Sequence, residues 1–327
     1  MNRRYIIYGL MSVLIYLSGC SGSDDDTVED GNWIKRSSFE GVGRAGAIAF
    51  VVGERAYVGL GYDGDDYLTD LWSYNPDENY WKKMTDFPGD GRTSTVSFAI
   101  GNKGYVGTGY NGDDEVNDFW EYDVTTDAWT QLADFGGSAR LSATGFAANG
   151  KGYIGTGYDG NYLKDFWEFD PDNNTWTQIV SLEGEKRNNA AAFVIDDKAY
   201  LGLGTNNGLY QLDFWEFDPV ALDWIAKLDI DEDDDYSITR ERAVSFSLDG
   251  YGYVTTGNGS SNLSSVWRYD PLYDLWKEKT SFEGTSRQGA VAFTVSGRAF
   301  VALGQNSSSR FDDVWEFLPN EIYDEDD

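Results

Sequence analysis

The tryptophans of this chain recur with a period of roughly 48 residues, and this repeat constrains the fold more than any other feature. The twelve tryptophans divide into two interleaved series of six. One series is Trp33, Trp81, Trp129, Trp176, Trp224 and Trp276, and the other is Trp72, Trp120, Trp167, Trp215, Trp267 and Trp315. A regular repeat of this length is typical of propellers and solenoids. The chain is therefore predicted to contain six copies of one unit.

Each copy contains four short segments rich in β-branched and aromatic residues, separated by clusters of Gly, Asn, Asp and Pro. In the first copy they run from Arg44 to Phe50, from Tyr57 to Gly61, from Asp70 to Tyr74, and around Trp81. A proline that presets a turn follows the third segment in four copies: Pro76, Pro171, Pro219 and Pro271. No stretch of this region has the apolar spacing of a helix. We therefore expect an all-β fold, a six-bladed β-propeller of four-stranded antiparallel blades.

The two ends of the repeat region predict how the ring closes. The pattern begins with a fourth-segment tryptophan, Trp33, and ends with a third segment around Trp315. The last blade therefore lacks a fourth strand of its own. We expect residues 33–35 to supply it, because this pairing leaves no open sheet edge.

The motifs of the unit resemble the kelch repeat. They are the arginine, the small-residue strand, Tyr-Val-Gly-X-Gly, the Tyr-Asp-Pro turn and the closing tryptophan, and the resemblance covers about residues 32–318. The chain carries Gly-X-Gly where kelch repeats usually carry Gly-Gly. The resemblance implies a propeller that binds ligands on one face. It implies no single activity, since kelch propellers include enzymes and binding modules.

The amino terminus has the pattern of a signal peptide. Arg3 and Arg4 precede a short apolar run from Tyr5 to Leu17, and the only cysteine, Cys20, follows Ser18 and Gly19. This end resembles a bacterial lipobox, which implies cleavage before Cys20 and lipid on its thiol. The acidic residues that follow are similar to the tether of surface lipoproteins in Bacteroidota. The alternatives are an ordinary secretory signal with an incidental cysteine, and a plain solvated linker.

These boundaries predict four segments. They are a signal peptide at 1–19, a lipidated acidic tether at 20–31, the propeller at 32–318 and an acidic tail at 319–327. The formal net charge of −31 argues against nucleic acid and anionic lipid as partners of the propeller. We expect a monomer that is held at the outer membrane, on the cell surface, only through lipid on Cys20.

An arginine stands at the start of the innermost strand in every copy, near the predicted mouth of the central channel. The six are Arg44, Arg92, Arg140, Arg187, Arg240 and Arg287. Guanidinium groups bind carboxylates well, and the kelch resemblance implies that arginines at similar positions contact acidic peptides or sugars. The alternative is that each arginine pairs with carboxylates of a neighbouring blade and holds the disc together.

The loops between second and third strands form a second set of candidates on the same face. In the first three copies they carry tyrosine with Asp or Asn, which suits sugar recognition, at Tyr62, Asp63, Tyr110, Tyr158 and Asp159. Carboxylates on the first of these loops (Asp63, Asp65 and Asp66) are a weak calcium candidate. No loop has EF-hand spacing, so we predict no metal site. The alternative interpretation of these residues is ordinary turn chemistry.

One connection is four residues longer than its siblings, around residues 228–235, and is rich in aspartate. It lies between the fourth strand of one copy and the first strand of the next, on the face of the candidate loops. A longer loop here is either a lid or binding element or a solvated acidic excursion.

The complete absence of histidine excludes Ser-His-Asp and Cys-His catalysis and any histidine-ligated metal. Galactose oxidase has a kelch-type propeller, but its copper centre needs histidines and a cysteine–tyrosine crosslink. The Gly-X-Gly pairs are not nucleotide motifs, because no helix follows them, and no cofactor is predicted. N-acetylneuraminate epimerases are also six-bladed kelch propellers, and they need no metal.

The sequence favours a lipid-anchored surface propeller that binds a glycan or a protein partner on its arginine-bearing face. A metal-free epimerase or mutarotase of an acidic sugar is the second hypothesis, and no catalytic residue can be assigned for it. A structural scaffold in an outer-membrane assembly is the third.

Overall fold

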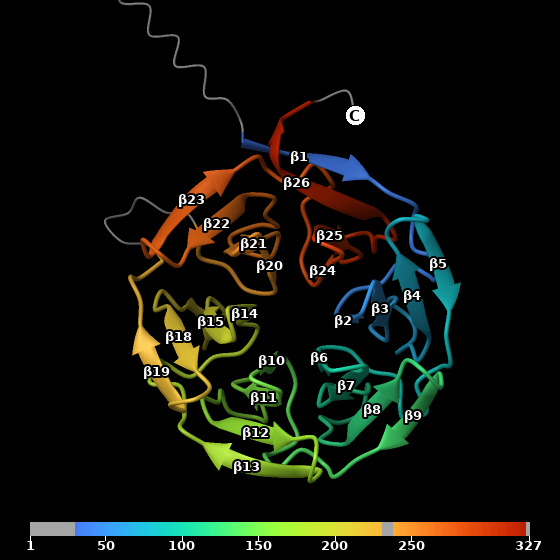
Figure 1. Ribbon diagram of the computed structural model, residues 1–327, viewed down its shortest axis with the longest axis vertical. Coiled ribbons are helices and arrows are strands. Elements are labelled where there is room, and N and C mark those ends of the chain that lie inside the picture. The colour runs from blue at the N-terminus through green and yellow to red at the C-terminus, as the bar shows by residue number, and fades with distance from the viewer. Residues whose placement is uncertain (1–29, 231–237, 325–327) are drawn as a thin grey trace, which may run out of the picture.

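A computed structural model describes residues 30–230 and 238–324, which form a ring of six antiparallel four-stranded sheets around a central axis (Figure 1). We number these sheets as blades 1–6 and name their strands a to d from the axis outward. This architecture confirms the predicted propeller. The described residues contain no helix that is long and apolar enough to cross a membrane.

The strands of each blade follow one another along the chain, except that the first strand of the chain belongs to the last blade. Blade 1 contains β2 (Ile48–Val52), β3 (Arg55–Gly59), β4 (Leu71–Asn75) and β5 (Tyr80–Lys83). Blade 2 contains β6 (Val96–Ile100), β7 (Lys103–Gly107), β8 (Phe119–Asp123) and β9 (Ala128–Gln131). Blade 3 contains β10 (Thr144–Ala148), β11 (Lys151–Gly155), β12 (Phe166–Asp170) and β13 (Thr175–Ile179).

The other three blades carry the two departures from this plan. Blade 4 contains β14 (Ala191–Ile195), β15 (Lys198–Gly202), β18 (Trp215–Asp218) and β19 (Asp223–Ala226), with a small hairpin of β16 (Thr205–Asn206) and β17 (Leu209–Tyr210) in its b–c loop. Blade 5 contains β20 (Val244–Leu248), β21 (Tyr251–Thr255), β22 (Val266–Asp270) and β23 (Leu275–Lys279). Blade 6 contains β24 (Val291–Val295), β25 (Arg298–Ala302), β26 (Val314–Ile322) and β1 (Asp30–Lys35).

The blades are joined at the hub by a closed circle of six backbone hydrogen bonds. Each bond runs from one residue's amide to the carbonyl of its counterpart in the preceding blade, at 2.8–3.4 Å. We call these residues the inner ring: Gly46, Ser94, Ser142, Asn189, Arg242 and Gly289. All six have φ between 51° and 62°. This left-handed conformation turns the amide and carbonyl sideways to the neighbouring blades and favours Gly and Asn.

The Gly-X-Gly motif makes a second circle outside the first. The amide of its last glycine donates to the carbonyl of the repeat arginine in the next blade, as Gly61 does to Arg92 at 2.8 Å. Gly61 has a φ of 97°, and a Cβ on it would lie 3.0 Å from the carbonyl oxygen of Ala45. Glycine is therefore required here for both its conformation and its lack of a side chain.

Aromatic side chains fill the wedges between the blades. At the seam of blades 6 and 1, Tyr74 meets Phe300 edge to face at 5.4 Å, while Trp81 packs against Phe39 at 4.9 Å. The same arrangement recurs at other seams, which explains the period of the tryptophans. Such rings bury 150–250 Å² each, so they supply much of the apolar burial of the domain.

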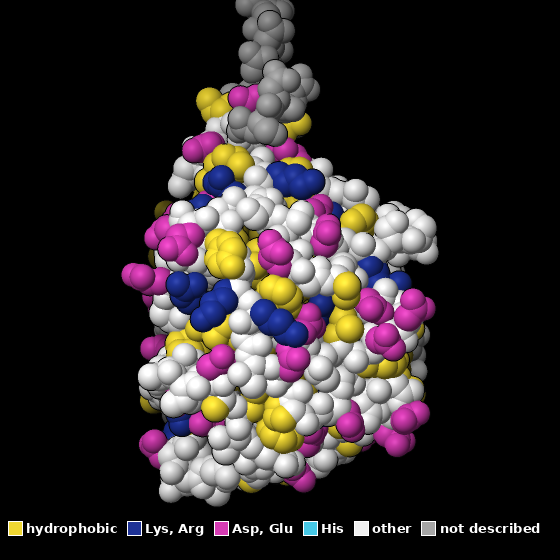
Figure 2. Space-filling model, turned by 90° about the vertical axis from the view of Figure 1, so that its right-hand side faces the viewer, with side chains coloured by type: hydrophobic (Ala, Val, Ile, Leu, Met, Phe, Trp, Pro, Cys, Tyr) yellow, Lys and Arg dark blue, Asp and Glu magenta, His cyan; other side chains and the backbone are white. Residues whose placement is uncertain are grey.

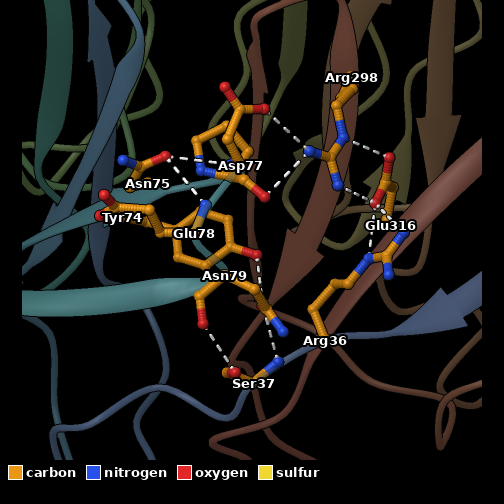
Figure 3. Close-up of polar contacts among 10 residues, drawn as sticks. Arg36, Ser37, Tyr74, Asn75, Asp77, Glu78, Asn79, Arg298 and Glu316 are labelled. Atoms are coloured by element: carbon orange, nitrogen blue, oxygen red, sulfur yellow. Dashed lines mark hydrogen bonds and ion pairs between the residues drawn. The ribbon is translucent and has the colours of Figure 1, made fainter.

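The ring closes as predicted, because β1 pairs with β26 as strand d of blade 6. The segment that follows β1 contacts both the last and the first blade, blades 6 and 1 (Figure 3). Arg36 and Arg298 both donate to the buried Glu316 carboxylate, with Nε–O distances of 2.6 and 2.7 Å. Ser37 donates its amide and hydroxyl to Asn79 of blade 1 at 3.0 and 2.8 Å.

The acidic side chains of the outer surface are spread out rather than gathered in one patch. On the side of the disc shown in Figure 2, carboxylates are scattered and interspersed with Lys and Arg. This distribution suits a solvated surface better than a single charged docking face.

We expect Trp33→Ala to lower the unfolding free energy by about 3–5 kcal/mol, because Trp33 is fully buried at the closing seam. Its ring packs on Phe282 and Phe317 at 4.9 and 4.7 Å. Urea unfolding measures the change. Tyr80→Ala is the control, since Tyr80 is 56% exposed on another outer strand. A loss no greater than that of the control would contradict the role of this seam.

Candidate functional site

The hub opens into a cavity of about 470 Å³ on the face that carries the b–c loops and the d–a connections. Every blade contributes to its wall. The lining residues are Ala45, Gly46, Tyr62, Thr93, Ser94, Thr95, Tyr110, Leu141, Ser142, Ala143, Asn189, Ala190, Arg242, Ala243, Gly289, Ala290, Gln305 and Arg310. Most are small because the six strands a converge here, so the inner ring forms the floor of an open cup.

The charge of this cup is opposite in sign to that of the chain. Arg242 and Arg310 are the only charged side chains among its lining residues, which include no Asp or Glu. Neither arginine forms an ion pair within residues 30–230 and 238–324. Two guanidinium groups therefore face a small cavity without a protein counter-charge.

Arg242 occupies an inner-ring position at which the other copies have Gly, Ser or Asn. Its φ of 52° is unfavourable for a long side chain, and the side chain is exposed. Strained conformations of this kind cost about 1–3 kcal/mol and persist mainly where function uses them. Glycine would adopt this backbone conformation with less strain energy than the arginine that the chain carries here.

Arg310 reaches the cup from the b–c loop of blade 6. Its guanidinium lies 5.0 Å from the centre of the Tyr62 ring, in cation–π contact. Its buried Nε has no hydrogen-bond partner among the described residues. Tyr62 also contacts Tyr67, which in turn meets Tyr110 edge to face. The ring that holds Arg310 is therefore itself packed in a row of three tyrosines. The guanidinium is held in place with donor capacity left over.

The six repeat arginines lie inside the blades, and none of them lines the cup. Each guanidinium is at most 1% exposed and bonds to groups of its own blade rather than a neighbouring one. In blade 3, Arg140 donates to both oxygens of Asp165 at 2.8 and 2.9 Å and to the Thr156 carbonyl at 3.0 Å. The Trp167 indole donates to the same carboxylate at 2.8 Å. The arginine thus ties strands a, b and c together.

The same Arg–Asp–Trp contact occurs in five blades. The aspartates are Asp70, Asp118, Asp165, Asp213 and Asp313. In blade 5, Ser265 takes this position and its hydroxyl accepts from Arg240 at 2.7 Å. Burial lowers the pKa of Arg240 to about 10, which leaves it charged at neutral pH.

The arginines also set the protonation of their partners. Burial by itself would raise the pKa of Asp70, Asp118, Asp165 and Asp313, but hydrogen bonds from the guanidinium and indole groups outweigh it. The pKa of each of these carboxyls is therefore held below its usual value of 3.8. They stay ionised and paired across the physiological range.

The other candidate residues fall into two groups. Tyr62 and Tyr110 line the cup, and their hydroxyls donate to Gly64 and Gly112 carbonyls at 2.6 and 2.7 Å. Asp63 caps its turn by accepting the amides of Asp65 and Asp66 at 2.9 and 2.8 Å, and these bonds lower its pKa.

Asp159 likewise accepts the Asn161 amide, at 3.1 Å, while Tyr158 lies outside the cup. The described residues contain no cluster of three metal-ligating side chains.

The long acidic connection is anchored at both of its described ends. Ile230 and Ile238 are fully buried in one apolar cluster between blades 4 and 5. The stretch between them, 231–237, lies outside the described residues, as do the signal peptide and Cys20.

A comparison with protein families agrees with this geometry. Residues 41–201 match the KLHDC2/KLHL20/DRC7 Kelch-repeats domain. These residues therefore carry kelch repeats. A search of curated proteins returned no match. The matched range covers blades 1–3 and the first two strands of blade 4, and the same four-stranded arrangement occurs in all six blades. Kelch propellers are scaffolds that bind proteins or other ligands.

The sequence prediction missed Arg242 and Arg310. In both cases the available signal was a departure from the repeat. Arg242 follows Arg240 by two residues, at a position that is small or an amide in the other copies, and Arg310 ends a b–c loop that is otherwise neutral. The six repeat arginines recur because every blade uses the buried contact that they make.

We expect Asp118→Asn to lower the unfolding free energy by about 3 kcal/mol, because it breaks an ion pair with the buried Arg92. The Asp118 side chain is 24% exposed, which places the loss at the lower end of the range for buried pairs. Chemical denaturation at pH 7 checks this. Asp114→Asn, on an exposed loop, is the matched control and should change stability little.

We expect the stability difference between wild type and Asp118→Asn to shrink on acidification. The folded-state pKa of Asp118 lies below the unfolded value of 3.8. The stabilisation is therefore complete above the unfolded pKa and is lost as pH falls through the folded pKa. Urea titrations between pH 7 and pH 2 measure it. A difference that stays constant down to pH 2 would show that the carboxylate charge is not what stabilises the blade.

Proposed function

We propose that this kelch domain is a binding module that holds an anionic ligand in the cup at its hub. The ligand would be a carboxylate-bearing glycan or a protein partner that presents a carboxylate. The observation that supports this most is the pair Arg242 and Arg310, which line the cup and form no ion pair within the described residues, in a chain whose net charge is −31. A guanidinium recognises a carboxylate with two parallel hydrogen bonds, so two of them give both charge and orientation.

The shape of the cup agrees with this function. A volume of about 470 Å³ falls within the range of small-ligand sites, and is large enough for one sugar or a few residues. Serine and threonine side chains and the Asn189 and Gln305 amides add hydrogen-bonding groups around the arginines. The acidic surface elsewhere would repel an anion and leave the cup as its favourable position.

The lining supports binding more than epimerisation or mutarotation of an acidic sugar. Proton transfer at a sugar carbon needs a general acid and base within reach of the substrate. The lining residues include no carboxylate, and the Tyr62 and Tyr110 hydroxyls already donate to backbone carbonyls. The cup therefore offers recognition groups without a matched pair for proton transfer.

We also propose that the domain is displayed at the cell surface by lipid on Cys20. The lipobox-like end and the acidic segment before Asp30 support this. The chain enters the disc at β1 on the outer rim, away from the hub (Figure 1). A tether attached there would leave the cup open to solvent and to a partner.

We expect Arg242→Gly and Arg310→Ala each to weaken binding of a carboxylate ligand by about tenfold or more, since each removes a charged hydrogen-bond donor. Isothermal titration with N-acetylneuraminate, glucuronate and a short acidic peptide measures this. Arg242→Gly should fold at least as well as wild type, because glycine suits the inner-ring conformation.

Arg55→Ala is the control, since Arg55 lies at the a–b turn of the opposite face. If a carboxylate ligand binds the variant that combines Arg242→Gly with Arg310→Ala as tightly as it binds wild type, the ligand does not bind in the cup.

A further inference from the structure

A second, smaller cavity of about 230 Å³ lies between the b–c loops of blades 3 and 4. It shares no lining residue with the cup. Its walls are Tyr158, Gly160, Asn161, Tyr162, Lys186, Asn206 and Asn207. A Cβ added to Gly160 would meet nothing within 4 Å, so the space beside this loop is open. We call this cavity the tyrosine cleft.

The b–c loop of blade 3, which forms one side of the tyrosine cleft, is one residue shorter than those of blades 1 and 2. The bridge that closes the loop joins Tyr158 to Tyr162, whereas the corresponding bridge in blade 1 joins Tyr62 to Tyr67. The Tyr62 hydroxyl donates back to its own loop. The Tyr158 and Tyr162 hydroxyls make no hydrogen bond within the described part of the chain. Two phenol groups of this loop are therefore available to a ligand.

The two rings meet edge to face. Their centres are 5.2 Å apart, their planes are inclined at 66°, and both residues line the cleft. An aromatic face is apolar and slightly negative, which suits the axial C–H groups on one side of a sugar ring.

Blade 4 supplies the polar wall. Its b–c loop folds into the β16–β17 hairpin, which brings Asn206 and Asn207 to the cleft. The Asn207 amide donates to the Asn206 side-chain oxygen at 2.9 Å, and this contact fixes the orientation of both amides. Each amide offers a donor beside an acceptor, the pattern that adjacent sugar hydroxyls require. The exposed ammonium of Lys186 adds further donors.

We infer that the tyrosine cleft binds one uncharged pyranose ring of a glycan. The ring would stack on a tyrosine face while its hydroxyls bond to the asparagine amides and to the free phenol groups. The single lysine and the absence of arginine among the lining residues distinguish this site from the anion-binding cup. The inference goes beyond the proposed function and does not depend on it.

Saturation-transfer NMR with methyl glycosides of glucose, galactose, mannose and N-acetylglucosamine tests this site. At least one glycoside should receive saturation from the wild-type protein at millimolar concentration. Tyr162→Ala should weaken that binding by about tenfold or more. Tyr162→Phe should keep most of the binding, because it retains the aromatic ring on which the sugar stacks. Both variants are expected to fold, because Tyr162 lies on a surface loop.

Two controls separate this site from the rest of the protein. Tyr273→Ala removes a tyrosine that is 68% exposed elsewhere, and should leave the signal unchanged. Arg242→Gly should also leave it unchanged, so failure of the cup and failure of the cleft give different results. The inference is overturned if none of the four glycosides receives saturation, or if the signal survives Tyr162→Ala.

Discussion

The closed circle of six hydrogen bonds at the inner ring is the constraint on which the rest of the structure depends. Each bond needs a residue whose amide and carbonyl point sideways, and this requires φ near +55° at all six positions. Once the circle forms, the strands a are fixed at a common distance from the axis. Their crowding then dictates small side chains at the hub and leaves large wedges outside, which tryptophan, tyrosine and phenylalanine fill.

The domain uses arginine in two different ways. The six repeat arginines are buried, paired and part of the blades, and removing a partner would leave an isolated charge in a place without water. Arg242 and Arg310 line the cup instead. Arg242 is exposed on a strained backbone, and Arg310 is half-buried against the Tyr62 ring. The first group makes the disc rigid, and this rigidity gives the second group a fixed geometry toward a ligand.

The fold could be predicted from the sequence because its causes are repeated. The tryptophan period, the Gly-X-Gly motif and the leading segment at Trp33 each report a contact that recurs in the blades, and the structure confirmed the ring and its closure. The candidate site could not be predicted in the same way. Arg240 and Arg242 are two residues apart just before β20, yet Arg240 is buried and Arg242 is exposed. Only the path of the backbone through the inner ring decides between them. The tyrosine cleft likewise depends on how the b–c loops of blades 3 and 4 fold beside each other.

The closure between β1 and β26 has a consequence for how the chain acquires its structure. Trp33 of β1 pairs with Phe317 of β26. The first strand of the disc therefore has no pairing partner until the last strand has formed. Contacts between such distant residues form slowly, because a long loop must close first. Until then, blade 6 presents a three-stranded sheet with an open edge, and partly formed discs can associate through it.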